Sequence, residues 1–183
     1  MPPPLPPPLP HTVADYLDRH HVMTLATCGP DGPWAAAVFY VNAGHTLFFL
    51  SSASSRHCRN LAQDPRCAAT IQEDYSDWAK IKGVQLEGLA SEIRGDEEVR
   101  ARQRYGDKFP VVGRLASPRR AAPSGRLPLG GTTPQASWGP SFPAAIALAL
   151  AKVRWYRLDA ERLYFVDNSQ GFGHRDQIDL GRD

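Results

Sequence analysis

The chain has 183 residues, 42% of them hydrophobic and 22% charged, and its 21 basic and 19 acidic residues give a net charge of +2. This length and composition are typical of one globular domain with a sizeable core. The small net charge, without a long basic run, argues against a surface for nucleic acid or for an anionic membrane.

The first half of the chain alternates strand-like runs with turn signals. The proline-rich residues 1–10 are expected to form a polyproline II or disordered tail. Thr12 can cap a helix that continues to His20. The next β-prone runs, separated by turn clusters at 29–32 and 42–44, are residues 22–27, 34–41 and 46–50. A short helix is predicted over 56–63, because Pro65 follows it.

The second half contains the remaining strand-like runs, which are residues 66–72, 80–93, 152–158 and 163–166. A charged helix is predicted to begin at Gly95 and to run toward Tyr105. Residues 117–143 carry six prolines and four glycines. Such a segment cannot build its own core, so we expect an extended or disordered insertion there.

These elements predict a mainly β fold with peripheral helices, of the α+β class. The strands follow one another in hairpin-like succession, without the regular β-α-β alternation of a parallel sheet. We expect an antiparallel barrel of six or seven strands, because closure leaves no open sheet edge. The domain would span residues 11–183, with the tail at 1–10 in front of it and the insertion at 117–143 within it.

A polar corner follows the third predicted strand. Residues 48–57 read Phe-Phe-Leu-Ser-Ser-Ala-Ser-Ser-Arg-His, so a buried run ends in hydroxyl groups and a cation at a helix start. Hydroxyls, the free N–H groups of a first helical turn and a guanidinium together suit a phosphate monoester. The candidate residues are Ser51, Ser52, Ser55, Arg56 and His57. Alternatively, Ser54 or Ser55 only caps the helix and Arg56 lies in solvent.

The same segment resembles the flavin-phosphate segment of the pyridoxamine 5′-phosphate oxidase-like family of FMN-binding split β-barrels. In that family an aromatic strand leads to a hydroxyl residue and then to Ser-Arg-Lys. Ser51 matches the hydroxyl, and Ser55 and Arg56 match Ser-Arg. His57 stands where the family has Lys, and a neutral imidazole donates only one hydrogen bond. The resemblance implies a split barrel, and it implies a homodimer, because family members bind FMN between two subunits.

The predicted strand at 80–93 also resembles a strand of that family. Lys82 stands where a basic residue can reach the flavin or its phosphate. True pyridoxamine-phosphate oxidases carry Gln at the next position, whereas this chain has Gly83. The departure weakens any transfer of the vitamin B6 reaction. The alternative for Lys82 is an ordinary strand lysine that faces solvent.

A third segment, residues 167–175, reads Asp-Asn-Ser-Gln-Gly-Phe-Gly-His-Arg. Together with Lys-Gly-Val-Gln and Phe-Pro-Val it is similar to one uncharacterised part of the family, the YhbP-like branch. Two glycines around an aromatic permit close approach of the backbone to a ligand ring. Phe172 could then stack on the flavin, and Arg175 could reach a phosphate or a ring carbonyl. Alternatively, this is a glycine-rich turn that Phe172 anchors.

The resemblance implies an FMN-binding flavoprotein. We expect an oxidoreductase that passes hydride or electrons through FMN, with a small-molecule substrate or a nicotinamide as donor. The alternatives are a deazaflavin-dependent reductase and a flavin- or haem-binding module without turnover, with His57 or His174 as axial ligand. The sequence identifies no catalytic acid, base or nucleophile. His174 is the best placed to act beside the ring, as a donor or proton relay.

No segment predicts a membrane-spanning or secreted protein. The longest apolar run, residues 144–151, is much shorter than the roughly 20 residues that a span needs. The N-terminus lacks the charged and apolar regions of a secretory signal. The three cysteines lack C-x-x-C spacing, and no histidine pair has metal-ligand spacing. We therefore expect a cytoplasmic protein with free thiols and without a bound metal.

Overall fold

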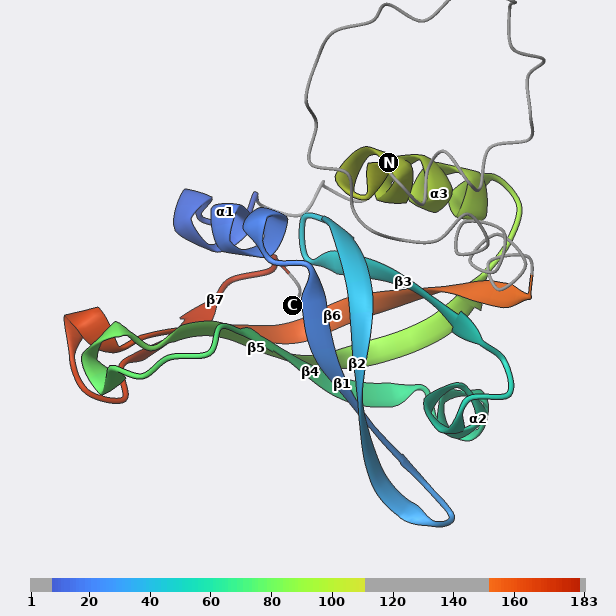
Figure 1. Ribbon diagram of the computed structural model, residues 1–183, viewed down its shortest axis with the longest axis horizontal. Coiled ribbons are helices and arrows are strands. Elements are labelled where there is room, and N and C mark those ends of the chain that lie inside the picture. Colours follow the sequence, from blue (N-terminus) through green and yellow to red (C-terminus); the bar gives the residue numbers. More distant parts are fainter. Residues whose placement is uncertain (1–7, 111–151, 182–183) are drawn as a thin grey trace, which may run out of the picture.

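The computed structural model describes residues 8–110 and 152–181 (Figure 1). Its strands are β1 (Val22–Gly29), β2 (Gly32–Ala43), β3 (Thr46–Ser52), β4 (Arg66–Gln72), β5 (Lys82–Ile93), β6 (Val153–Asp167) and β7 (Arg175–Ile178). Its helices are α1 (His11–Arg19), α2 (Arg56–Gln63) and α3 (Asp96–Lys108), with two short 3₁₀ turns, η1 (Trp78–Lys80) and η2 (Asn168–Gln170). Residues 1–7 of the proline-rich tail and the predicted insertion at 117–143 lie outside the described residues.

Six of the strands close into a barrel. Neighbouring strands follow the order β3-β2-β1-β4-β5-β6-β7, and a further pairing between β3 and β6 joins the two ends of the β1–β6 set. All of these pairs are antiparallel. β7 continues the sheet beside β6, outside the closed barrel. The predicted fold class, a mainly β split barrel with peripheral helices, is confirmed.

The barrel interior is filled by side chains that alternate along each strand. In β1, Met23 and Leu25 are fully buried, whereas the intervening Thr24 is exposed. This is the period of two expected when one face of a strand is covered. On the inner face of the β3–β6 pair, Phe49 stacks on its direct partner Tyr156, with ring centroids 5.2 Å apart. The alternation fixes which residues face outward and are available to a ligand or partner.

Helix α1 begins one residue before Thr12, at His11, and its N-cap is Pro10. The prediction that Thr12 caps this helix is therefore wrong. The carbonyl of Pro10 accepts the N–H groups of Val13 and Ala14, at 3.0 Å each. Because the proline ring already holds φ near its helical value, the helix starts without a side-chain cap.

Helix α3 covers the outer side of β3 and β6. Ala101 and Tyr105 are buried in one cluster with Trp155, and the rings of Tyr105 and Trp155 meet edge to face at 5.3 Å. The helix is therefore held by a small core of its own, outside the barrel. No helix in the described part of the chain has the length and apolar character needed to cross a membrane.

The last two predicted strands are one continuous strand, β6. The polar residues near Asp159 suggest a break, but Ala160 is buried and lies opposite Gly88 of β5. The register of the pair shifts between Glu87 and Gly88, and this irregularity lets β6 continue. The short strand β7 was not predicted, because three of its four residues are exposed and show no apolar alternation.

Candidate functional site

Three side chains converge where β3 gives way to α2. The Nε2 atom of His57 lies 2.7 Å from Oγ of Ser51 and 3.1 Å from Oγ of Ser55. The two hydroxyl oxygens are 3.4 Å apart. We call this group, Ser51, Ser55 and His57, the cradle. The structure thus brings together three of the predicted site residues.

The cradle lies at the N-terminus of α2. Ser55 is the N-cap, and its Oγ accepts the N–H of Cys58 at 3.4 Å. The capping interpretation and the binding interpretation therefore use the same residue. The N–H groups of Arg56 and His57, in the first turn, have no acceptor within the helix, and the helix dipole is positive at this end. Hydroxyl, imidazole and backbone donors at one point suit an oxyanion.

The end of the Arg56 guanidinium reaches the β1–β2 hairpin. Its Nη2 donates to the carbonyls of Asp31 at 2.8 Å and Gly32 at 3.5 Å. Its guanidinium also lies 4.7 Å from the centre of the Trp34 ring. Its Nε is buried and has no hydrogen-bond partner among the described residues. Arg56 therefore ties α2 to the hairpin and keeps one unused donor.

Two residues that the sequence reasoning missed lie directly behind the cradle. Burial alone would raise the pKa of the Cys58 thiol, but hydrogen bonds with His57, Ser55 and Tyr156 outweigh burial and lower the pKa to about 7. Tyr156 comes from β6, far along the chain from α2. No spacing in the sequence connects the two, so only the β3–β6 pairing could reveal the contact.

The other predicted residues do not join the cradle. Ser52 is exposed and bonds to Ser54 at 2.8 Å. Nζ of Lys82 pairs with Asp167 at 3.1 Å. Phe172 is 79% exposed and stacks on Trp78, with ring centroids 5.9 Å apart.

Lys82 and the cradle mark opposite ends of β6. Ser51 pairs with Arg154 at the start of β6, and Lys82 pairs with Asp167 at its end. β6 is 15 residues long, which corresponds to about 50 Å of extended chain. In Figure 1 the η1–η2 end and helix α2 accordingly lie at opposite sides of the molecule. One protomer therefore does not bring both groups to one small ligand.

A shallow apolar groove of about 370 Å³ lies on the outer face of the sheet between these ends. It is lined by small and polar residues of β1, β4, β5 and β6, with Arg175 of β7: Thr24, Ala26, Ala68, Thr70, Gln85 and Tyr164. The guanidinium of Arg175 lies 4.6 Å from the Tyr164 ring centre, and its Nη1 lies 3.5 Å from Oε1 of Gln85. Ala35 and Ala37 of β2 are exposed. Small outward side chains leave room for a flat ring.

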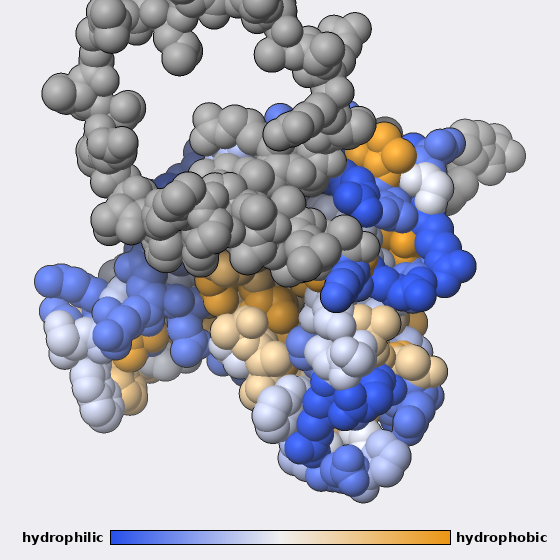
Figure 2. Space-filling view, turned by 45° about the vertical axis from the view of Figure 1, so that its right-hand side comes forward, coloured by the Kyte–Doolittle hydropathy of each residue, from blue (hydrophilic) through white to orange (hydrophobic). Residues whose placement is uncertain are grey.

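The surface around β2 also exposes large apolar side chains. Val22 of β1 pairs with Phe39 of β2, and they are 40% and 56% exposed. Trp34 is 41% exposed. Figure 2 shows hydrophobic residues gathered in the middle of one face, with hydrophilic residues around them. An exposed apolar pair such as Val22 and Phe39 is typical of an interaction surface.

Asp167 holds the loop that carries Phe172. Its carboxylate accepts the N–H of Ser169 at 3.0 Å and the hydroxyl of Ser169 at 2.6 Å, and it pairs with Lys82. Burial would raise the pKa of Asp167, but the hydrogen bonds from Ser169 and Lys82 outweigh it and lower the pKa to about 2. The charged carboxylate is thus part of the folded loop.

We expect Asp167 to contribute to stability above about pH 4 and to lose that contribution as the pH falls toward 2. The sign follows because the pKa of Asp167 is lower in the folded protein than in the unfolded chain. Asp167→Asn should lower the unfolding midpoint at pH 7. At pH 2–3 the difference in unfolding midpoint between the variant and wild type should be smaller. The exposed Asp15→Asn serves as control. An equal difference at both pH values would contradict the assignment.

The histidines at the two ends differ in availability. His57 is buried, and its Nε2 is held by Ser51 and Ser55. Nε2 of His174 lies 2.9 Å from a carboxylate oxygen of Asp176, on a partly exposed loop. In the described part of the chain, no group of three or more His, Cys, Asp or Glu residues is arranged to hold a metal ion.

The closed six-stranded barrel, with β7 beside β6 and helices around it, defines a split β-barrel protein. The chain belongs to the pyridoxamine 5′-phosphate oxidase family, whose model matches residues 9–126. A UPF0306 protein of Klebsiella pneumoniae subsp. pneumoniae is 36% identical over 108 residues, which is 58% of this chain and 74% of that protein. A second UPF0306 protein, from Photorhabdus laumondii, is 39% identical over 98 residues, 52% of this chain and 68% of the relative. The resemblance to the uncharacterised YhbP-like branch is confirmed.

Solved structures share the fold. A haem-binding protein from Mycobacterium smegmatis aligns with a TM-score of 0.60 at 25% identity, over 90% of this chain and 56% of that one. ChuZ from Campylobacter jejuni aligns with a TM-score of 0.64 at 17% identity, over 93% and 58%. HutZ from Vibrio cholerae, described as a haem storage protein, aligns with a TM-score of 0.57 at 19% identity, over 86% and 94%.

Proposed function

We propose that this protein binds FMN and acts as an FMN-dependent oxidoreductase. The observation that carries the proposal is the convergence of Ser51, Ser55 and His57 at the N-terminus of α2. The cradle offers donors of several kinds to a single oxyanion, as a phosphate monoester requires. Membership of the pyridoxamine 5′-phosphate oxidase family supports the same ligand class.

The chain's own residues suggest how the phosphate would be held. The hydroxyls of Ser51 and Ser55 and the first-turn N–H groups would donate to its oxygens, and the dipole of α2 would offset its charge. Nε of Arg56 is buried without an acceptor among the described residues, so a phosphate oxygen there would satisfy it. His57 would donate through Nε2, which already faces both hydroxyls.

The flat ring system would lie in the outer groove, where Ala26, Ala68 and Ala35 leave space. Bound FMN would accept two electrons from a nicotinamide or another reduced small molecule and pass them on. Arg175 lines this groove in the same subunit, whereas Lys82 and Phe172 lie too far along β6 to serve the cradle of their own subunit. A two-fold homodimer would bring them from the partner subunit, and the exposed apolar side chains of β1 and β2 support such an interface.

Haem is the second candidate ligand. One observation favours it: His174 is paired with Asp176 beside the exposed, stacked rings of Trp78 and Phe172. Metal-ligating histidines are commonly oriented by a carboxylate in this way, and flat aromatic surfaces suit a macrocycle. The haem-binding neighbour from Mycobacterium smegmatis supports testing it. His57, whose Nε2 is engaged by hydroxyls, is the poorer axial ligand.

The ligand is identified by purifying the protein without added cofactor and recording its absorption spectrum and the mass of the released ligand. We expect flavin bands, the mass of FMN and a dimer by light scattering. Ser55→Ala should weaken FMN binding by about 1–2 kcal/mol, because it removes one donor and the helix cap together. A Soret band that Ser55→Ala leaves intact and His174→Ala abolishes would replace FMN with haem.

A further inference from the structure

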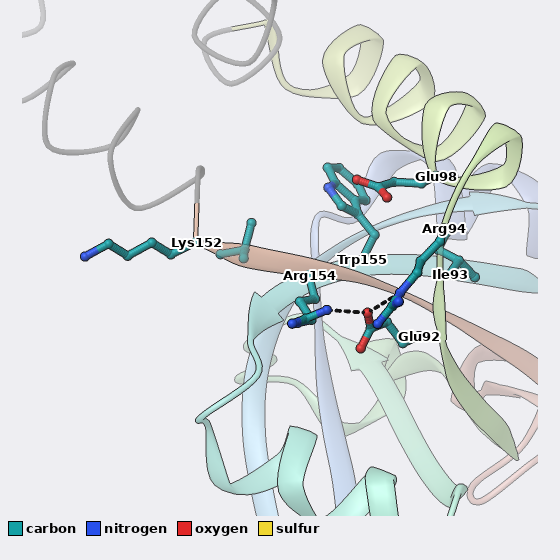
Figure 3. Close-up of a pocket in the computed structure, with 8 residues that line it drawn as sticks. Glu92, Ile93, Arg94, Glu98, Lys152, Arg154 and Trp155 are labelled. Carbon is teal, nitrogen blue, oxygen red and sulfur yellow. Dashed lines mark hydrogen bonds and ion pairs between the residues drawn. The ribbon is translucent and has the colours of Figure 1, made fainter.

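A polar cavity of about 410 Å³ opens at the end of β5 and the start of β6 (Figure 3). Charged side chains and one indole from three consecutive parts of the fold line it: Glu92, Arg94, Glu98, Lys152, Arg154 and Trp155. The sequence reasoning singled out none of these residues, and the proposed FMN site does not use them.

The cavity carries an excess of positive charge. One carboxylate, that of Glu92, accepts from both Arg154 at 2.8 Å and Arg94 at 2.9 Å. Burial would raise the pKa of Glu92, but hydrogen bonds from these two arginines lower it, so the carboxylate stays charged. Two guanidinium groups thus share the charge of Glu92. The second lining carboxylate, Glu98, pairs with Arg102 of its own helix, and the Lys152 side chain extends away from the two arginines in Figure 3. A multivalent anion is the ligand that such a cavity favours.

A buried donor adds a second, independent observation. Trp155 is only 3% exposed, and its indole Nε1 is buried without a hydrogen-bond partner among the described residues. In Figure 3 the nitrogen edge of this ring lies on the side of Lys152. Buried N–H groups are normally paired, so an unpaired one at a cavity indicates an acceptor from outside the described residues.

Arg154 connects this cavity to the cradle. It is the direct partner of Ser51 in the β3–β6 pair, and directly opposed residues in an antiparallel pair point to the same face. Two positions further along, the stacked rings of Phe49 and Tyr156 show that this shared face is the inner one. The Cβ atoms of Ser51 and Arg154 are therefore about 5 Å apart. Ser51 belongs to the cradle and Arg154 lines the cavity, so the two sites are neighbours.

We propose that this cavity is a second phosphate subsite, and that the protein's ligand carries two neighbouring phosphate groups. This inference rests on the proposed function, because the first phosphate lies in the cradle. The second would be bound by Arg154 and Arg94. The diphosphate would belong to a flavin dinucleotide in place of FMN, because the single phosphate of FMN would occupy the cradle alone.

The first test uses inorganic anions, so that it does not depend on flavin. Binding of pyrophosphate and of phosphate to the full chain is measured by calorimetry. Wild type should bind pyrophosphate more tightly than phosphate. Arg94→Gln/Arg154→Gln should weaken pyrophosphate binding at least tenfold, which is the effect of losing one charged hydrogen bond. Glu92→Gln should act in the opposite direction and tighten pyrophosphate several-fold, because it releases both arginines.

Removing both arginines leaves Glu92 without its partners, so the triple variant Glu92→Gln/Arg94→Gln/Arg154→Gln is measured as well. Arg66→Gln/Arg104→Gln removes two exposed positive charges outside the cavity and serves as the matched control. Equal pyrophosphate binding by wild type and the triple variant would overturn the proposal, and so would an equal loss in the control.

The second test identifies the source of the diphosphate. FAD and FMN are titrated into the cofactor-free protein, and NADPH into the FMN-loaded protein. If the triple variant loses affinity for FAD but not FMN, the diphosphate belongs to the cofactor. A loss of NADPH affinity with FAD affinity unchanged would contradict the proposal, and so would equal losses for FMN and FAD. Pyrophosphate binding without any flavin binding would leave the subsite standing and refute the proposed FMN function.

Discussion

Gly88→Ala is expected to destabilise the barrel by about 2–3 kcal/mol or more, in the upper range for an overpacked site. A Cβ at Gly88 would meet the backbone of β6, with the carbonyl carbon of Asp159 at 2.9 Å and Cα of Ala160 at 3.0 Å, and the carbonyl oxygen of Asp159 closer still. Backbone atoms cannot turn aside as a side chain can. β6 is also paired with β3 on its other side, so it cannot retreat.

The effect is measured from the midpoint of thermal or denaturant unfolding. Ser91→Ala, at an exposed position of the same strand, is the control and should change stability by no more than about 0.5 kcal/mol. If Gly88→Ala unfolds at the same midpoint as wild type, the close approach of β5 and β6 at this point is wrong. If the variant does not fold at all, the loss of stability is at least as large as the stability of wild type, which agrees with the expected destabilisation.

Gly88 also explains why the sequence did not show β6 as one strand. Polar residues around Asp159 suggest a break, and the contact that keeps the chain extended comes from β5, about 70 residues away in sequence. Local patterns did succeed where the signal was local. Helix α2 runs from Arg56 to Gln63 as predicted, because Ser55 caps its start and Pro65 follows its end.

The candidate site likewise contains residues that are close in sequence and residues that are far apart in sequence. Ser51, Ser55 and His57 lie within one short segment, so their convergence could be predicted from spacing. Arg154 and Tyr156 stand about 100 residues further on and meet that segment only through the β3–β6 pairing. No single-sequence pattern encodes a pairing at such a separation, which is why both residues were missed.

Separation along β6 limits the site prediction further. Lys82 and the cradle were both assigned to one cofactor, yet they mark opposite ends of this strand. The family resemblance places FMN between two subunits, and a dimer is the arrangement that reconciles the two groups. The assignment of Lys82 and Phe172 to the flavin therefore depends on the homodimer and is tested with it.

Arg56→Ala is expected to weaken FMN binding by about 1.5–3 kcal/mol, or roughly 10- to 150-fold, the range for hydrogen bonds to a charged group. Its guanidinium already donates to the hairpin carbonyls through Nη2, whereas its Nε is buried without an acceptor. A bound phosphate oxygen would supply that acceptor. Affinity is measured by quenching of flavin fluorescence.

Riboflavin, which lacks the phosphate, separates the two roles of Arg56. If Arg56 holds the phosphate, Arg56→Ala should change riboflavin affinity little while it weakens FMN strongly. If Arg56 acts only by tying α2 to the hairpin at Asp31 and Trp34, both ligands should weaken together. Arg59→Ala removes an exposed positive charge from the same helix and should leave the ratio of the two affinities unchanged. Equal losses for FMN and riboflavin would mean that Arg56 does not bind the phosphate. The cradle of Ser51, Ser55 and His57 would then bind the anion without Arg56, since the hydrogen bonds that bring these three side chains together do not involve it.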